Sequence, residues 1–203
     1  ARARHAPEAL DLFKRGTEVG KTGDVERAAE LLQRATELDP DLADAHFNLG
    51  IAERKRGRLD PAIAAMRQVI VLRPDDFEAH VRLGSWFAEQ GSHVEATRSY
   101  ERAAALRMDS REAWLGLAQS YEASGRARAA VGAYRRAIGL LPHDDPALYA
   151  ALLRTALQAG DGPVAVEAAR KLLAYRPGHE GFIALGEALL LSGEADAAIL
   201  EHQ

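Results

Sequence analysis

The chain has 203 residues, of which 47% are apolar and 28% are charged, proportions that are typical of a globular protein with a sizeable core. Its formal net charge is -4 and its isoelectric point is near 6.0, so the overall charge attracts neither nucleic acid nor an anionic membrane. The lack of cysteine excludes disulfides, thiolate zinc sites and thiol nucleophiles.

No apolar run approaches the roughly 20 residues that a membrane-spanning helix needs, and no apolar stretch of a signal peptide follows the first residues. We therefore expect no insertion into a membrane, and the cytoplasm is the favoured compartment. Because the chain begins with Ala1 and not with methionine, we expect it to be a fragment of a longer protein.

Glycine recurs along the chain at a nearly constant spacing. Successive members of the series are 34, 34, 34, 35 and 33 residues apart, and they are Gly23, Gly57, Gly91, Gly125, Gly160 and Gly193. Five residues after each glycine stands an alanine, at Ala28, Ala62, Ala96, Ala130, Ala165 and Ala198. A fixed period of this length indicates a repeated structural unit.

Each unit is predicted to hold two amphipathic helices, because apolar residues recur at spacings of three and four on both sides of the glycine. The glycine ends the first helix in the left-handed conformation, and a proline stops the second helix in most units. In chain order the predicted pairs cover residues of about 9–42, 43–76, 77–110, 111–144 and 146–178, followed by a truncated pair over 179–203. One residue is inserted within 142–146, which we interpret as a surface loop, with a change in superhelix curvature as the alternative.

The letters Gly20-Lys21-Thr22 match the end of a phosphate-binding loop. Such a loop also needs a preceding strand and a glycine five residues before Gly20, where Arg15 stands. Because the same place in every other unit is a helix–helix turn, we interpret this segment as a turn and predict no nucleotide and no other cofactor.

Several features of the unit resemble the tetratricopeptide repeat: the period, the Leu-Gly pair in the first helix, the glycine turn, and the recurring alanine and proline. The fourth unit is the best match, through Trp114, Leu117, Ala118, Tyr121, Gly125, Ala130, Tyr134, Ala137 and Pro142. The resemblance implies an all-α, right-handed solenoid of stacked antiparallel helix pairs, with about five complete repeats and a truncated sixth in one domain over residues 1–203. The chain departs from the pattern at Arg15, Met108 and Ala169.

No constellation in the sequence points to catalysis. His46 and His80 occupy equivalent places in successive units, but equivalent helices of a stack lie ~8 to 10 Å apart, whereas each zinc bond is ~2 Å. We therefore expect half-buried packing histidines, no metal site and no catalytic residue, so an enzyme is not expected within this fragment.

The resemblance further implies that the first helix of each pair lines a concave groove that binds peptides or protein segments. Aligning the units predicts the groove residues Phe13, Thr17 and Lys21; Asp44, Phe47, Asn48, Ile51, Arg54 and Lys55; Glu78, Val81, Arg82, Ser85 and Glu89; and Glu112, Leu115, Gln119 and Glu122. The apolar stripe among them is Phe13, Phe47, Ile51, Val81 and Leu115, and it suits a partner segment with a few apolar anchors.

Two other functions remain open. The unfinished last unit is expected to leave Leu189, Leu190 and Ile199 partly uncovered, so the chain could form homo-oligomers through its open ends. Alternatively, it could be the substrate-docking arm of a larger enzyme. Nucleic acid is not expected as a partner, because acidic residues dilute the basic row on the second helices, which is formed by Arg34, Arg67, Arg102, Arg135, Arg136, Arg170 and Lys171.

Overall fold

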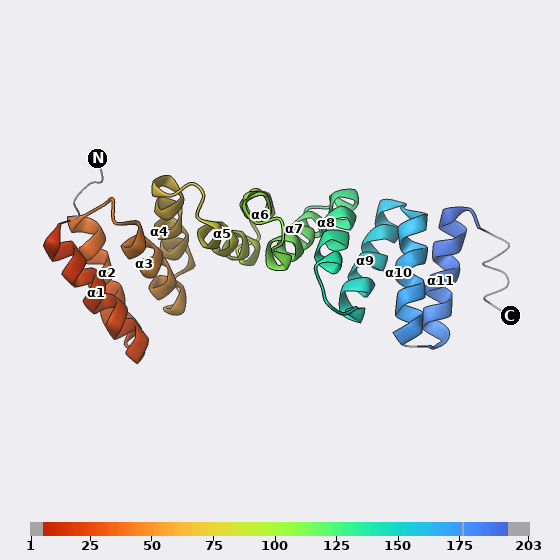
Figure 1. The fold of residues 1–203 in the computed structure, drawn as a ribbon, viewed down its shortest axis with the longest axis horizontal. Coiled ribbons are helices and arrows are strands. Elements are labelled where there is room, and N and C mark those ends of the chain that lie inside the picture. Colours follow the sequence, from red (N-terminus) through yellow and green to blue (C-terminus); the bar gives the residue numbers. More distant parts are fainter. Residues whose placement is uncertain (1–5, 176, 195–203) are drawn as a thin grey trace. The chain divides into compact units, whose positions relative to one another are not determined.

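A computed structural model describes residues 6–175 and 177–194 of the chain. Within these ranges the fold is all helical, with eleven helices and no strand (Figure 1). The chain divides into two compact units, which cover residues 1–92 (unit 1) and 93–203 (unit 2). The prediction of an all-α protein built from consecutive helix pairs is confirmed.

Each helix packs against its neighbour in the chain within its unit. Unit 1 contains α1 (Pro7–Thr22), α2 (Val25–Leu38), α3 (Ala43–Lys55), α4 (Leu59–Leu72) and α5 (Phe77–Glu89). Unit 2 contains α6 (His93–Leu106), α7 (Arg111–Ala123), α8 (Ala127–Gly139), α9 (Pro146–Ala159), α10 (Gly162–Tyr175) and α11 (His179–Ser192). None of the helices in the described ranges is long and apolar enough to cross a membrane.

The recurring glycine forms the turn between the two helices of a pair. Its φ is positive in all six helix-pair repeats, between 71° and 96°, and no other residue type has a positive φ in the described part of the chain. Only glycine takes this conformation without strain from a side chain. The predicted helix–turn–helix junctions are therefore confirmed.

Small residues recur at one buried place on the second helices. The alanine five residues after the turn is 1% exposed at Ala28 and 0% exposed at Ala62, Ala96, Ala130 and Ala165, whereas Ala198 lies outside the described residues. The leucine of the first helix is buried as well, at Leu49, Leu83, Leu117, Leu152 and Leu185. Because both sets recur in successive helix pairs, each compact unit has a core that continues from one pair to the next.

Two departures from the repeat pattern, Arg15 and Ala169, are accommodated by the structure. Arg15 stands where later units have leucine, and it lies exposed on α1 with its guanidinium 3.2 Å from the Asp11 carboxylate. Ala169 is buried with 1% exposed, although an aromatic residue is usual at its place. These substitutions change single packing positions and leave the helices intact.

The loop over 142–146 is tied to the helices around it. The Asp144 carboxylate accepts hydrogen bonds from Lys171 Nζ at 2.9 Å and from the Tyr149 hydroxyl at 2.8 Å, and the Asp145 side chain accepts one from the Ala147 amide at the start of α9. The hydrogen bonds from Lys171, mainly, and from Tyr149 lower the pKa of Asp144 from its ordinary value. The inserted residue is thus accommodated by a loop with its own polar contacts.

The expected exposure of α11 is partly wrong. Leu189 is fully buried, whereas Leu190 is 61% and Leu191 44% exposed. Successive residues of a helix point about 100° apart, so Leu185, Ala188 and Leu189 share the face that is buried, and Leu190 lies off that face. Ile199 lies outside the described residues.

An especially close contact joins α6 and α7 at Gly116. The Tyr100 ring, 8% exposed, covers this glycine so closely that a Cβ added there would lie 2.3 Å from the ring atoms Cε1 and Cζ. By contrast, a Cβ at Gly132 on α8 would meet no heavy atom within 4 Å. Both glycines lie inside helices, but Gly116 is buried against Tyr100, whereas Gly132 is exposed.

We predict opposite effects for the same substitution at these two places. Gly116→Ala overpacks the contact with Tyr100 and should lower the free energy of unfolding by about 1 to 3 kcal/mol. Gly132→Ala should raise it by about 0.5 to 1 kcal/mol, because alanine has the higher helix propensity. Urea unfolding followed by circular dichroism measures both, and equal stabilisation by the two substitutions would contradict the contact.

Candidate functional site

A pocket of about 190 Å³ lies in unit 1 between α1, α2 and α3. We call it the α1–α3 pocket. It is lined by Gly16, Thr17, Gly20 and Lys21 from α1, by Val25, Ala28 and Leu32 from α2, and by Asn48, Ile51, Ala52 and Lys55 from α3. Five of these residues, Thr17, Lys21, Asn48, Ile51 and Lys55, belong to the groove predicted from the sequence.

Two glycines on one face of α1 shape the pocket. A Cβ at Gly16 would lie 2.9 Å from Leu32 Cγ, so α1 approaches α2 there without room for a side chain. One helical turn later, a Cβ at Gly20 would lie in ordinary contact with Ala28 Cβ, at 3.4 Å. The space that a larger side chain at Gly20 would occupy is therefore open, and it forms part of the pocket.

The other six lining residues were not predicted from the sequence: Gly16, Gly20, Val25, Ala28, Leu32 and Ala52. The signal that could have indicated this part of the pocket is Gly20, because the equivalent places in the next three repeats hold Arg54, Ala88 and Glu122. A glycine there is specific to the first unit.

A polar pair crosses the pocket wall from α3 to α1. Asn48 Nδ2 donates a hydrogen bond to Thr17 Oγ1 at 2.9 Å, and Thr17 Oγ1 donates to the Phe13 carbonyl at 2.8 Å. The Asn48 side-chain carbonyl oxygen has no hydrogen-bond partner within the described ranges. It remains free to accept a hydrogen bond from a ligand.

Two lysines stand at equivalent places in the last turns of α1 and α3. Lys21 Nζ lies 2.6 Å from a Glu18 carboxylate oxygen, but both side chains are well exposed, so this ion pair contributes little energy. Lys55 makes no ion pair in the part of the chain that the structure describes. Each ammonium group also interacts favourably with the negative end of its helix dipole.

A buried carboxylate holds the turn that follows Lys55. The Glu53 side chain, 6% exposed, accepts hydrogen bonds from Arg58 Nη2 at 2.7 Å and from Arg56 Nη1 at 3.0 Å. Burial alone would raise the pKa of Glu53, but the Arg58 hydrogen bond and the charges of both arginines outweigh it and hold the pKa below its ordinary value. The end of α3 that carries Lys55 is thereby fixed.

The other predicted groove residues of unit 1 mostly contact one another. Arg54 forms two hydrogen bonds with the Glu89 carboxylate, at 2.7 and 2.9 Å, and Arg82 lies 2.6 Å from Glu78 with its guanidinium 6.0 Å from the centre of the Phe47 ring.

Asp44 pairs with Arg73 at 2.8 Å. Phe13 is half-buried against the core, Ser85 is exposed, and Val81 is 4% exposed, so the Val81 side chain belongs to the core and adds no surface to the stripe.

In unit 2, Glu122 is occupied by internal contacts. Its carboxylate accepts hydrogen bonds from the Tyr134 hydroxyl at 2.8 Å and from Arg154 Nε at 2.9 Å. Burial and the hydrogen bond to Glu122 raise the pKa of Tyr134. Leu115 is half-buried, and Glu112 and Gln119 are exposed on α7.

The two histidines that were considered as metal ligands, His46 and His80, donate hydrogen bonds within the fold. The Nε2 atoms of His46 and His80 lie 2.9 and 2.8 Å from the Pro40 and Pro74 carbonyl oxygens, which can only accept, so each ring donates. At the equivalent place Trp114 Nε1 donates to the Met108 carbonyl at 2.9 Å. These bonds fix the connection into the next pair, and within the described residues no group of three or more His, Asp or Glu side chains could hold a metal.

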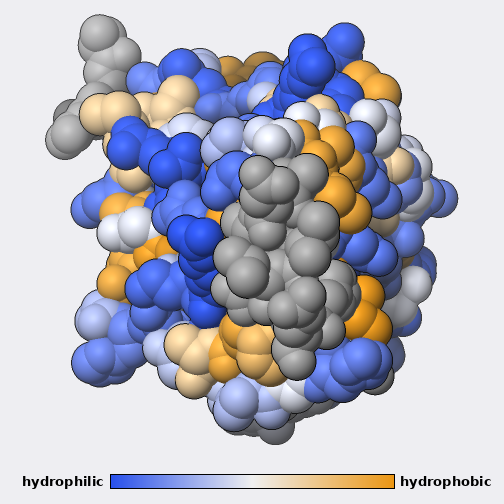
Figure 2. Space-filling view, turned by 90° about the vertical axis from the view of Figure 1, so that its right-hand side faces the viewer, coloured by the Kyte–Doolittle hydropathy of each residue, from blue (hydrophilic) through white to orange (hydrophobic). Residues whose placement is uncertain are grey.

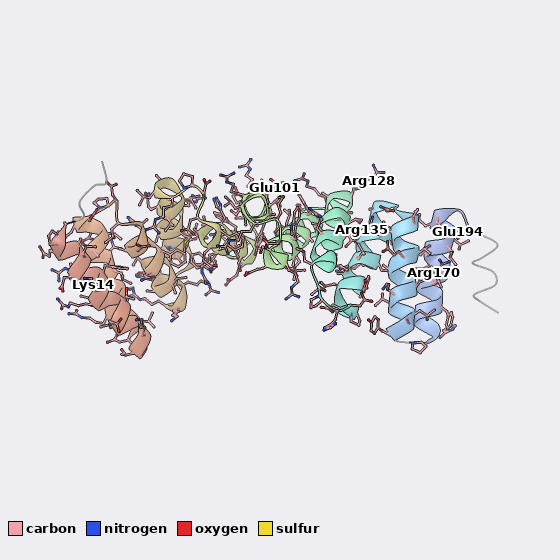
Figure 3. The ribbon with its side chains drawn as sticks, viewed as in Figure 1. Lys14, Glu101, Arg128, Arg135, Arg170 and Glu194 are labelled. Carbon is pink, nitrogen blue, oxygen red and sulfur yellow. The ribbon has the colours of Figure 1, made fainter. Side chains whose placement is uncertain are left out.

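The basic row of the second helices pairs with aromatic and acidic side chains. Arg67 lies over the Phe87 ring at 5.2 Å, Arg136 over Trp114 at 5.6 Å and Lys171 over Tyr149 at 5.8 Å. Arg135, labelled with Arg170 in Figure 3, lies 3.8 Å from Glu167. The cation–aromatic pairs were not predicted from the sequence.

The repeated helix pair closed by a glycine turn defines the chain as an α-helical repeat protein. The family model for the tetratricopeptide repeat matches residues 13–76, 52–110, 95–145 and 150–203, so the chain belongs to this family. The expected resemblance is confirmed. Proteins of this family are typically non-enzymatic interaction modules.

The proteins to which the chain is similar include one relative by sequence and two solved structures. The uncharacterized protein MJ0572 of Methanocaldococcus jannaschii is 50% identical over 42 residues, which cover 21% of this chain and 49%, or about half, of that relative. The structure of MamA, residues 41 to the end, from Desulfovibrio magneticus RS-1 has a TM-score of 0.71 at 19% identity and covers 87% of this chain and 99% of its own.

The third is the structure of YrrB, described as a tetratricopeptide repeat protein with an unusual peptide-binding site. It has a TM-score of 0.73 at 17% identity and covers 91% of this chain and 92% of its own. At these identities the two structural likenesses show the fold alone.

The lowered pKa of Glu53 predicts a specific pH dependence of stability. Because the folded pKa lies below the unfolded one, ionised Glu53 stabilises the fold above the unfolded pKa, and this contribution disappears as the pH falls through the folded pKa. Between about pH 7 and about pH 3, Glu53→Gln should therefore lose less unfolding free energy than the wild type, as measured by urea unfolding. Glu26→Gln, which changes an exposed carboxylate of the same unit, should follow the wild-type profile. Identical profiles for Glu53→Gln and the wild type would contradict this role.

Proposed function

We propose that the α1–α3 pocket is the anchor site of a surface that binds a segment of another protein. The observation that carries this proposal is the pocket itself, in which five predicted groove residues from two successive units surround an apolar floor. Open apolar hollows with a few convergent polar groups are the usual form of ligand sites.

The size of the pocket supports a protein segment over a whole small molecule. Sites for drug-sized molecules usually have volumes of about 300 to 1,000 Å³. This pocket has about 190 Å³, and a cavity of about 150 Å³ is known to hold benzene. Its volume thus suits one apolar side chain of a longer partner.

The polar groups at the pocket support the same function. The free Asn48 oxygen can accept a hydrogen bond from a peptide amide, and Ile51 on the next turn of α3 supplies apolar contact beside it. Family membership and the peptide-binding site described for YrrB agree with a peptide-binding role. A substrate-docking arm of a larger enzyme would use the surface in the same way.

The single-solenoid interpretation of residues 1–203 stays a prediction.

A peptide library displayed on phage tests this function on the purified chain. We expect selected peptides to bind the wild type, and Ile51→Asp to weaken binding tenfold or more, because a carboxylate in an apolar pocket costs more than the ~1.4 kcal/mol that corresponds to tenfold. Val71→Asp on α4 makes the same change at a side chain that is 70% exposed and outside the pocket, and it should leave the affinity unchanged.

Both variants are first compared with the wild type by circular dichroism and thermal unfolding. The selection of no peptide from a diverse library, or equal weakening by the two substitutions, would reject the pocket as a peptide site.

A second candidate function, self-assembly, is supported by α11. Four large apolar side chains of this helix are exposed, Phe182, Ile183, Leu190 and Leu191, with fractions between 36% and 61%. Figure 2 views the molecule from the side of α11, and hydrophobic surface is visible there between hydrophilic regions. Burying such side chains against a second copy is favourable.

This candidate predicts that the mass of the chain depends on concentration. Sedimentation equilibrium should show dimers or larger species that Leu190→Glu converts to monomers, because the carboxylate cannot be buried in an apolar contact. Glu187→Gln, on the same helix, serves as the control and should leave the association intact. A monomer at all concentrations would exclude self-assembly of this chain.

A further inference from the structure

We propose that the α1–α3 pocket selects a peptide in which an apolar side chain stands beside a carboxylate. This inference rests on the proposed function and names the chemistry of its partner. The apolar residue fills the pocket, the carboxylate lies at the two lysines, and a backbone amide of the peptide donates to Asn48.

The apolar part follows from the floor of the pocket. Val25, Ala28 and Leu32 on α2 face Ile51 and Ala52 on α3, and the missing side chain of Gly20 leaves the space between them open. A hydrophobic side chain of the partner would fill this space and remove apolar surface from water on both molecules.

The carboxylate follows from the charges that line the same pocket. Lys21 and Lys55 contribute two ammonium groups, and no acidic residue lines the pocket. Lys55 has no ion-pair partner within residues 6–175 and 177–194, and the exposed Glu18 that pairs with Lys21 can be displaced at small cost. Arg54, by contrast, is already held by two hydrogen bonds to Glu89 and is not available in the same way.

The hydrogen-bond acceptor places the peptide backbone between these two parts. The Asn48 amide is oriented by its donation to Thr17, so its oxygen is the remaining polar atom of the side chain without a partner among the described residues. Covering it with an apolar ligand would leave an acceptor unpaired, whereas a peptide N–H satisfies it.

The lysine pair is confined to the first two helix-pair repeats. The equivalent places in the third, fourth and fifth repeats hold Glu89, Ala123 and Gln158. Repetition of the fold therefore does not explain the two lysines, and their positive charge distinguishes the pocket from the corresponding surface of the later units.

The test uses the peptide library of the proposed function and compares the selected sequences. We expect apolar residues flanked by Asp or Glu to be enriched on the wild-type chain. Replacing the acidic residue of the strongest peptide by its amide should weaken binding roughly twofold to fivefold, as measured by fluorescence anisotropy.

Charge reversal in the protein provides the decisive comparison. Lys55→Glu should remove the preference for acidic flanks and favour Lys or Arg beside the same apolar residue. Lys14→Glu makes the same charge change on α1 outside the pocket, at the residue labelled in Figure 3, and should keep the acidic preference. A preference that persists in Lys55→Glu, or is lost equally in Lys14→Glu, would overturn the inference.

Filling the pocket separates the apolar contribution from the charges. Gly20→Leu should abolish binding of the selected peptides while the variant stays helical, and Gly20→Ala, which adds only one methyl group, should weaken binding less. Unchanged binding to Gly20→Leu would overturn the placement of the apolar residue. Peptides that bind at the pocket without any acidic preference would overturn the inference but retain the proposed function, whereas the absence of any bound peptide would reject both.

Discussion

The close approach of neighbouring helices at small residues is the constraint on which the rest of the structure depends. Gly16 against Leu32 within one pair, and Gly116 against Tyr100 between two successive pairs, leave no space for a Cβ, and the alanine after each turn is buried wherever the structure describes it. Since protein interiors are packed as densely as organic crystals, such contacts allow few alternatives for the angle and register of two neighbouring helices. Each pair must then cover its remaining apolar surface with the next helix, and the surface left to solvent is the part that can bind a partner.

The candidate site is a direct result of this constraint. Gly16 lets α1 approach α2, and one turn later Gly20 keeps the same face of the helix bare where the two helices no longer touch as tightly. A third helix, α3, then closes the hollow with Asn48 and Ile51. The same chemical property, absence of a side chain, therefore produces tight packing at one position and an open pocket at the other.

The sequence predicted the features that depend on local backbone requirements. A glycine turn and a buried alanine recur because each unit must solve the same steric problem, so period alone located them. The groove residues depend on which side chains find partners, and alignment cannot supply this. Glu122 is held by Tyr134 and Arg154, Val81 is buried, and Leu189 lies on the packed face of α11, although the pattern alone placed them at surfaces. The division into two compact units is likewise not visible in a period that continues through both.

The indole bond of Trp114 to the carbonyl of Met108 has a practical consequence. The chain has two tryptophans, and they are distributed so that Trp86 lies in α5 of unit 1 and Trp114 in α7 of unit 2. The Trp114 ring is covered by Arg136 and anchored by its N–H, whereas Trp86 is buried with 5% exposed. Each compact unit thus carries its own intrinsic fluorophore, and when one tryptophan is replaced, the emission of the other reports the melting of its own unit.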